Sequence, residues 1–340
     1  METQLLNANE VSIKLACELL EKGEVVGLPT ETVYGLAGDA RNSNAIKKIF
    51  EAKGRPGDNP LIVHIADMNM LYGIVSHIPE DAKKLAKVFW PGPLTIIMPK
   101  GSLVANETCA GLDSVGVRMP SNPIAHEIIK RSKIPFAAPS ANLSGKPSPT
   151  TANDVFIDMN GKIPLIIDGG TCNAGVESTV VSVLEDTPVL LRPGVVTASQ
   201  IEQVLGKKVV IAKAITEGVK SDEKVLSPGM KYKHYAPNAE ITILSGNLQK
   251  FADYVREHET NDTFVLCFEG EENHFDVPAI TFGSHDDPNS QAHELFSALR
   301  KLDKLGAKNV FAREPKKDGV SLAVYNRLIR SAGFKIIKLK

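Results

Sequence analysis

Apolar residues recur along the first two hundred positions with two alternating periods, one typical of amphipathic helices and one of buried strands. In the first helical segment Ile13, Ala16 and Leu20 share one face, and Ser12 is predicted to cap the first turn. Further helices are predicted at 44–53, 79–90 and 198–205, and strands at 24–28, 61–65, 94–98, 114–119, 136–138, 164–167, 179–184, 189–191 and 209–211. So many strands with interleaved helices imply one large mixed α/β sheet.

The alternating pattern lapses between residues 212 and 237 and then resumes. The resumed pattern predicts strands at 241–244, 263–268, 310–312 and 334–339, and helices at 248–258, 290–304 and 320–331. We therefore expect three parts: a large domain over 1–211, a linker over 212–237, and a small α/β domain over 238–340.

Charge and composition narrow the class of protein. The 340 residues carry 39 Lys and Arg against 40 Asp and Glu, so no overall basic field indicates nucleic-acid binding, and a charged partner needs a local patch. No uncharged apolar run approaches the roughly 18 residues of a membrane span, and Glu2 and Glu10 do not suit a signal peptide. We expect a cytoplasmic protein without a membrane partner. The four cysteines are widely spaced and are expected to be buried thiols.

Several common nucleotide and hydrolase motifs are absent. The sequence contains neither GxGxxG nor GxxxxGK[ST], and it lacks GxSxG and HExxH. A bound nucleotide would therefore be held in another way.

Two polar clusters lie beside predicted buried strands. The segment 29–36, PTETVYGL, follows a strand, where hydroxyls can position a ligand, although taken alone the segment is better explained as a capped turn. In the segment 53–64, KGRPGDNPLIVH, Lys53 and Arg55 stand on a loop stiffened by Gly and Pro and form a candidate anion site. The alternative is compensation of a helix dipole. His64 is either a satisfied core histidine or a ligand contact.

Further polar positions mark strand ends. Arg118 lies within an apolar strand and requires an anionic partner, either a structural carboxylate or a ligand. The loop 138–151 supplies hydroxyls, an amide and free backbone N–H groups before a helix, for which Thr151 is a predicted N-cap. Glu177-Ser178-Thr179 and Arg192 add a hydroxyl and a cation at other strand ends.

The linker contains an unusual motif, SPGMKYKHYAP at 227–237. Tethering does not require two tyrosines and three basic side chains between prolines. The motif is interpreted either as an active-site lid or as a segment docked on a domain surface.

Taken together and in order, PTETVYGL, KGRPGDNPLIVH, PGPLT, VGVRMP, PSANLSGKPS, ESTVV, LRPG and SPGMKYKHYAP closely resemble the two-domain form of the threonylcarbamoyl-AMP synthase family, the YrdC-like family with an appended C-terminal domain. The motifs cover about two-thirds of the chain. The resemblance implies a large twisted mixed-sheet YrdC-like domain followed by a smaller Rossmann-like α/β domain.

The resemblance also implies an activity. Such a nucleotidyltransferase makes threonylcarbamoyl-AMP and pyrophosphate from L-threonine, bicarbonate or CO2, and ATP with Mg²⁺, and a separate complex transfers the group to tRNA. tRNA and that threonylcarbamoyl-transfer complex are accordingly candidate partners.

The resemblance further implies which residues lie near each of the two substrates, by matching motif positions. The positions near threonine are Thr32, His64, Arg118, Ala138 and Ser178. The positions near the nucleotide are Lys53, Arg55, Asn59, Ser114, Ser140, Asn142, Ser148 and Arg192, with Tyr235 from the linker. Lys53 and Arg55 are the predicted catalytic residues, and the linker contact to phosphate is Lys231, Lys233, His234 or Tyr235.

Two other functions are weighed against this one. A related cavity adenylates carbamoyl phosphate in carbamoyl-transfer enzymes, but those carry extra modules for which this chain lacks the cysteine spacing. An RNA-binding or ribosome-assembly module is disfavoured by the net charge and by the lack of an aromatic stacking platform.

Overall fold

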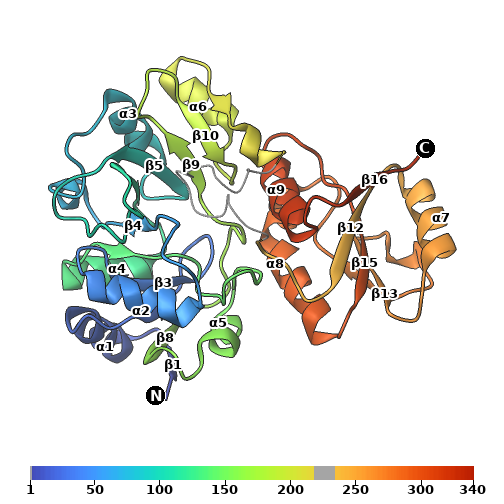
Figure 1. The fold of residues 1–340 in the computed structure, drawn as a ribbon, viewed down its shortest axis with the longest axis horizontal. Helices are drawn as coiled ribbons and strands as arrows, with labels where there is room; N and C mark the ends of the chain where they lie inside the picture. Colours follow the sequence, from blue (N-terminus) through green and yellow to red (C-terminus); the bar gives the residue numbers. More distant parts are fainter. Residues whose placement is uncertain (1, 218–233) are drawn as a thin grey trace.

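The computed structural model describes residues 2–217 and 234–340 and has two α/β domains side by side (Figure 1). Each domain is built on its own sheet, a large mixed one and a smaller parallel one. This confirms the predicted fold class.

Mixed strand directions characterise the larger sheet. Within the described residues its order is β1-β8-β2-β3-β7-β4-β6-β5-β9-β10-β11. Its strands are β1 (Gln4–Asn7), β2 (Val26–Leu28), β3 (Gly35–Asp39), β4 (Ile62–His64), β5 (Leu94–Pro99), β6 (Ser114–Arg118), β7 (Phe136–Ala137), β8 (Leu165–Asp168), β9 (Thr179–Ser182), β10 (Val189–Arg192) and β11 (Val210–Ile211). Strand β4 runs parallel to β6, whereas β7 runs antiparallel to β4 and β9 antiparallel to β10.

Helices cover both faces of this sheet. They are α1 (Glu10–Glu21), α2 (Ser43–Lys53), α3 (Glu80–Phe89), α4 (Pro123–Ser132), α5 (Ala152–Met159) and α6 (Ala198–Leu205), with short 3-10 turns η1 (Met68–Leu71) and η2 (Lys213–Ile215). Alternate residues of a strand point to opposite faces. Leu165 and Ile167 pack in the cluster that contains α1 and α4, whereas Ile166 packs in the cluster that contains α2, α3, α5 and α6.

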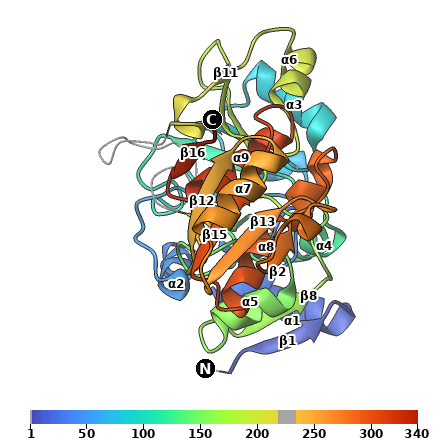
Figure 2. The same cartoon turned by 90° about the vertical axis from the view of Figure 1, so that its right-hand side faces the viewer.

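The smaller sheet is entirely parallel, in the order β14-β13-β15-β12-β16. Its elements are β12 (Glu240–Ser245), α7 (Leu248–His258), β13 (Thr263–Cys267), η3 (Glu272–His274), β14 (Ala279–Thr281), α8 (Pro288–Lys304), β15 (Asn309–Arg313), α9 (Ser321–Ser331) and β16 (Ile336–Lys338). Helices α8 and α9 lie between this sheet and the larger domain, and α7 covers the other face, in front of the sheet in Figure 2.

Apolar packing and ion pairs join the two domains. Val33 and Val176 of the larger domain belong to the core cluster of the smaller one. Gly175 has a φ of +74°, and a Cβ there would lie 2.4 Å from the Cα of His293 in α8, so only glycine permits this approach. Arg300 of α8 donates to Asp158 at 2.8 Å, and both side chains are buried. The larger domain is thus fixed against α8 and α9.

The structure corrects two predicted helix starts. Asn9, not Ser12, is the N-cap of α1, and Ser12 occupies the N3 position of the capping box. Pro79 is the N-cap of α3 and not its first helical residue. Thr151 is the N-cap of α5, as predicted. Strands β1, β3 and β14 and helix α4 were not predicted.

The four cysteines are buried free thiols, which confirms the prediction for them. In the two described ranges, every helix is too short or too polar to cross a lipid bilayer.

Candidate active site

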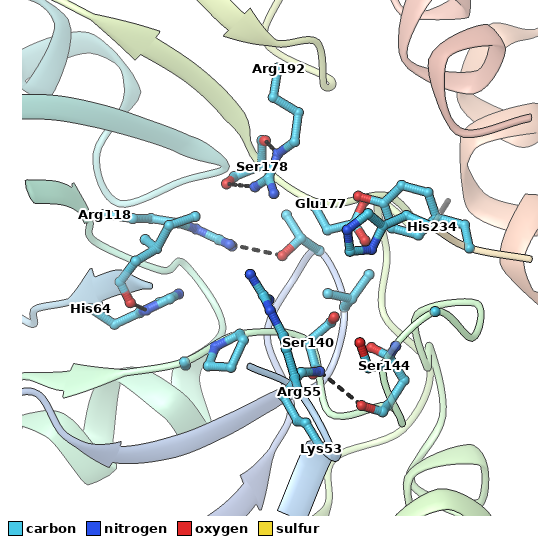
Figure 3. A pocket seen from close by; sticks show the side chains of 18 residues that line it. Lys53, Arg55, His64, Arg118, Ser140, Ser144, Glu177, Ser178, Arg192 and His234 are labelled. Carbon is cyan, nitrogen blue, oxygen red and sulfur yellow. Dashed lines mark hydrogen bonds between the residues drawn. The ribbon is translucent and has the colours of Figure 1, made fainter. Parts of the chain in front are cut away.

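A cavity lies at the edge of the larger sheet that faces the smaller domain (Figure 3). Its space, including the part open to solvent, measures about 670 Å³. It is lined by Thr32, Val33, Lys53, Arg55, Ile62, His64, Arg118, Ala138, Pro139, Ser140, Asn142, Ser144, Gly145, Glu177, Ser178, Arg192, His234 and Tyr235. The carboxyl ends of β4, β6 and β10 supply His64, Arg118 and Arg192.

Lys53 is the last residue of α2, and Gly54 ends the helix in the left-handed conformation. Its Nζ turns inward and donates to the carbonyl oxygens of Ser140 and, at 2.8 Å, Asn142. Burial, with the positive charge of Arg55, lowers the pKa of Lys53 to about 7. The lysine therefore ties the loop after β7 to the end of α2, and its charge is sensitive to an added anion.

Arg118 has a carboxylate partner within the chain. Its Nη2 lies 2.6 Å from Glu31 Oε1, its Nη1 donates to Thr32 Oγ1 at 2.8 Å, and its Nε donates to the Gly92 carbonyl at 3.3 Å. Burial alone would raise the pKa of Glu31, but the adjacent Arg118 outweighs it and holds that pKa below its usual value. The structural carboxylate is thus present, and Arg118 also lines the cavity, where its contact with a ligand stays a prediction.

His64 is buried, as expected for a core histidine, and it also lines the cavity. Its ring stacks on Phe136 with 5.7 Å between centroids, and its Nδ1 lies 3.1 Å from the Ile62 carbonyl oxygen. Burial and the nearby Arg118 lower its pKa to about 3, so the imidazole is neutral at physiological pH. The remaining nitrogen points toward the cavity in Figure 3 and can accept a hydrogen bond.

Ser178 and Arg192 form a second polar group, across the cavity from Lys53 and Arg55 (Figure 3). Arg192 donates from Nε to the Ser178 carbonyl at 2.9 Å and from Nη2 to the Ser178 hydroxyl at 3.0 Å. The hydroxyls of Ser178 and Thr95 lie 2.8 Å apart. Burial lowers the pKa of Arg192 to about 10, so the guanidinium remains charged.

The structure brings most of the predicted residues together. The predicted residues in the lining are Thr32, Lys53, Arg55, His64, Arg118, Ala138, Ser140, Asn142, Ser178, Arg192 and Tyr235. Lys231 and Lys233 lie outside the described residues, whereas His234 lines the cavity beside Tyr235.

Three predicted nucleotide contacts do not line the cavity. Ser114 begins β6, at the end opposite Arg118, and Asn59 is fully buried. Ser148 donates to Glu177 Oε1 at 2.5 Å. Their contact with a nucleotide stays a prediction.

Some lining residues were not predicted. Ser144 and Gly145 lie inside the motif PSANLSGKPS and Val33 inside PTETVYGL, so the motifs contained their signal. Glu177 stands directly before Ser178, in a segment that the sequence had already singled out.

The arrangement suits an anionic ligand with two different ends. Lys53, Arg55 and Arg192 supply positive charge that can stabilise phosphate oxygens. Arg118, Thr32 and His64 supply a cation, a hydroxyl and a neutral acceptor at one side of the cavity, which suit a small zwitterion.

Comparisons with known proteins agree with this description. Residues 18–194 match a family model described as "Telomere recombination", and residues 196–333 match one described as "Threonylcarbamoyl-AMP synthase, C-terminal domain". The larger domain therefore belongs to the YrdC-like class of domains.

Curated relatives match over the whole length. Threonylcarbamoyl-AMP synthase of Bacillus subtilis is 44% identical over 340 residues, with 99% of this chain and 97% of the relative covered. The enzyme of the same name from Pyrococcus abyssi is 44% identical over 339 residues, with 97% and 96% covered. The crystal structure of Sua5 from Pyrococcus abyssi complexed with L-threonine has a TM-score of 0.89 at 42% identity and covers 100% of this chain and 99% of that one. The chain belongs to the threonylcarbamoyl-AMP synthase family.

Proposed function

We propose that this chain joins L-threonine, bicarbonate or CO2, and ATP into threonylcarbamoyl-AMP, with release of pyrophosphate. The observation that carries this proposal is a single cavity in which the cations Lys53, Arg55 and Arg192 lie around a hydrogen-bonded Arg118–Thr32 pair with His64 nearby. Membership of the family supports the same reaction.

Threonine is assigned to the side formed by Thr32, His64 and Arg118. A guanidinium has five N–H donors. The three contacts of Arg118 within the chain leave donors for the substrate carboxylate. Neutral His64 is suited to accept a hydrogen bond from the threonine amine or hydroxyl. Ala138 and Ser178 complete this assignment.

The triphosphate is assigned to Lys53, Arg55 and Arg192, with Ser140, Asn142 and Tyr235 beside it. The neutral threonine amine adds CO2 and releases a proton to give an N-carboxylate, and a carboxylate oxygen then attacks the α-phosphorus as pyrophosphate leaves. No enzyme nucleophile is needed. Catalysis comes from alignment of the two substrates and from cations that stabilise charge on the phosphate oxygens and leaving group.

Mg²⁺ is proposed to enter as part of the ATP substrate. Glu177 is the one carboxylate among the described lining residues, and its oxygens already accept from Ser148 and Arg327. Across the two described ranges, no group of three His, Cys, Asp or Glu side chains is placed to hold a metal. The phosphates themselves are the ligands that Mg²⁺ commonly keeps in such sites.

Residues 234–237, the described end of the linker motif, are proposed to cover the cavity during turnover, and residues 227–233 of the motif lie outside the described residues. Both the carbamate and the mixed anhydride decompose in water, so closure protects them. His234 and Tyr235 already line the cavity, and the Ala236 amide donates to the Gly145 carbonyl at 2.8 Å.

The product is a reactive anhydride that a tRNA-modifying transfer complex consumes. We therefore propose that the protein acts in the cytoplasm, together with that complex.

The deciding experiment is mass spectrometry of the product made from ATP, labelled bicarbonate and L-threonine. We expect label in a threonylcarbamoyl-AMP ion and an equal amount of pyrophosphate. Replacing threonine and bicarbonate by carbamoyl phosphate tests the carbamoyl-adenylating alternative, and omission of RNA tests the RNA-binding one. Absence of the labelled anhydride in the complete, RNA-free mixture would contradict the proposal.

A further inference from the structure

Arg327 of α9 reaches from the smaller domain to the wall of the cavity. Its side chain is fully buried at 0% exposure. Its Nε donates to Glu177 Oε2 at 2.9 Å, its Nη1 to the Pro193 carbonyl at 2.7 Å, and its Nη2 to the Glu177 carbonyl at 3.3 Å. One guanidinium therefore grips two separate segments of the larger domain.

Those two segments carry lining residues. Glu177 directly precedes Ser178, and Pro193 directly follows Arg192. Strands β9 and β10 are antiparallel neighbours, so the start of one lies beside the end of the other. Arg192 donates to the carbonyl and the hydroxyl of Ser178. By holding the chain neighbours of both residues, Arg327 fixes the position of this hydrogen-bonded pair.

Arg327 also balances a charge. Glu177 lines the cavity, and burial alone would raise its pKa. The neighbouring Arg327 and Arg192 outweigh that effect and hold the pKa of Glu177 below its usual value. Glu177 is therefore ionised, and without Arg327 its negative charge would be less compensated in the cavity that is assigned to the triphosphate.

We propose that Arg327 is a positioning residue through which the smaller domain completes the nucleotide site, by neutralising Glu177 and by holding the segments that present Ser178 and Arg192. This inference rests on the proposed function, because it takes ATP as the ligand of the cavity. It gives the smaller domain a role in nucleotide affinity that does not require contact with the substrate.

Calorimetric titration with MgATP tests the charge balance in the full chain. We expect Arg327→Met to weaken MgATP binding about tenfold or more, since truncation leaves a buried carboxylate uncompensated. Glu177→Gln in the Arg327→Met background removes that carboxylate and is expected to restore most of the affinity. A residue that served only to hold the domains together would give a double variant at least as weak as the single one.

Arg300→Met is the matched control. Arg300 makes an ion pair of the same type between the domains, to Asp158 at 2.8 Å, and it donates to the Pro147 carbonyl, but neither partner lines the cavity. We expect its MgATP affinity to fall less than that of Arg327→Met, because Asp158 stands behind Lys53 and Leu143 and not in the lining. Equal losses in Arg300→Met and Arg327→Met, or a double variant that is not rescued, would overturn the inference while the proposed function stands. Failure of the wild-type chain to bind MgATP would overturn both.

Arg327→Lys tests the positioning role and covers the case in which Arg327→Met does not fold. The lysine keeps the positive charge but cannot donate to Glu177 and Pro193 at the same time. We expect KM for ATP close to the wild-type value and kcat lowered about tenfold, because Ser178 and Arg192 are less well oriented. Unchanged kcat and KM would refute the positioning role.

Discussion

Each of the two sheets has a strand whose last residue is a buried arginine, Arg313 in the smaller sheet and Arg192 in the larger one. The surroundings of these two arginines differ. Arg313 ends β15, and Glu271 accepts from its Nε and Nη2 at 3.0 to 3.2 Å. Its guanidinium also lies 5.4 Å from the ring centroid of Phe251 and 5.6 Å from that of Phe268. Arg192 ends β10, donates to the neutral oxygens of Ser178, and lines the cavity.

This difference shows that the end of a strand does not by itself make a binding site. In the smaller domain a carboxylate and two aromatic rings consume the interactions of the arginine. In the larger domain the arginine donates to Ser178, with the carboxylate of Glu177 nearby, and it lines a cavity that also contains Lys53 and Arg55. We therefore expect substitutions at the first arginine to affect stability and substitutions around the second to affect turnover.

The largest effect on turnover is expected at Lys53 and Arg55. Lys53→Ala or Arg55→Ala should lower pyrophosphate release about 10²- to 10³-fold, because each removes positive charge that stabilises the transition state. Folding should persist, which circular dichroism and thermal unfolding can verify. Pyrophosphate release at the wild-type rate in either folded variant would remove its assigned catalytic role.

The paired variants Arg192→Met and Arg313→Met test the comparison directly. Arg313→Met leaves Glu271 buried without its partner and should lower the free energy of unfolding by about 3 to 5 kcal/mol. Its turnover per folded molecule should not change. Arg192→Met should instead lose much of its turnover, and its free energy of unfolding should fall less than that of Arg313→Met. Denaturant unfolding and pyrophosphate assays on the same samples separate the two results, and a shared pattern would contradict the distinction.

The two sheets also show which features the sequence could predict. Helices α6 and α7 have the predicted bounds because their apolar periodicity and caps are local. Strand β3 was missed because its sequence, GLAGD, lacks β-branched residues. A Cβ on Gly38 would lie 3.2 Å from Ile49, so close packing against α2 favours glycine there.

The motifs predicted the residues that line the cavity better than the buried partners that hold those residues in place. Arg118 was predicted to need an anion, but Glu31, 87 positions away, became its partner only in three dimensions. The contact between Arg327 and Glu177 joins residues 150 positions apart across two domains. Such pairs depend on the packing of α9 against the larger domain, which no local pattern encodes.

A smaller effect is expected in proton uptake, which distinguishes Lys53 from the arginines. Its pKa of about 7 leaves the amine mostly neutral at pH 8 in the free protein. Bound phosphate favours the charged form and raises this pKa toward its ordinary value, so MgATP binding should take up a proton at pH 8. At pH 6 the amine is already charged, and uptake from this group should vanish.

Calorimetry in buffers with different ionisation enthalpies measures this proton. The apparent binding enthalpy should depend on the buffer at pH 8 and much less at pH 6. Lys53→Met should abolish the dependence at pH 8, whereas Arg313→Met should retain it. A dependence that survives in Lys53→Met would assign the proton to another group.

The smallest effect is expected in the choice between threonine and serine. The two differ by one methyl group, which an apolar wall discriminates by about 1 to 3 kcal/mol. Ile62 and Ala138 supply apolar surface beside His64 and Arg118. We therefore expect kcat/KM for serine to be lower than for threonine by roughly 10- to 200-fold, with no strict exclusion. Pyrophosphate release measured with each amino acid gives this ratio. Arg313→Met should leave the ratio unchanged, because Arg313 does not line the cavity. Equal values for the two amino acids would show that this wall does not contact the methyl group.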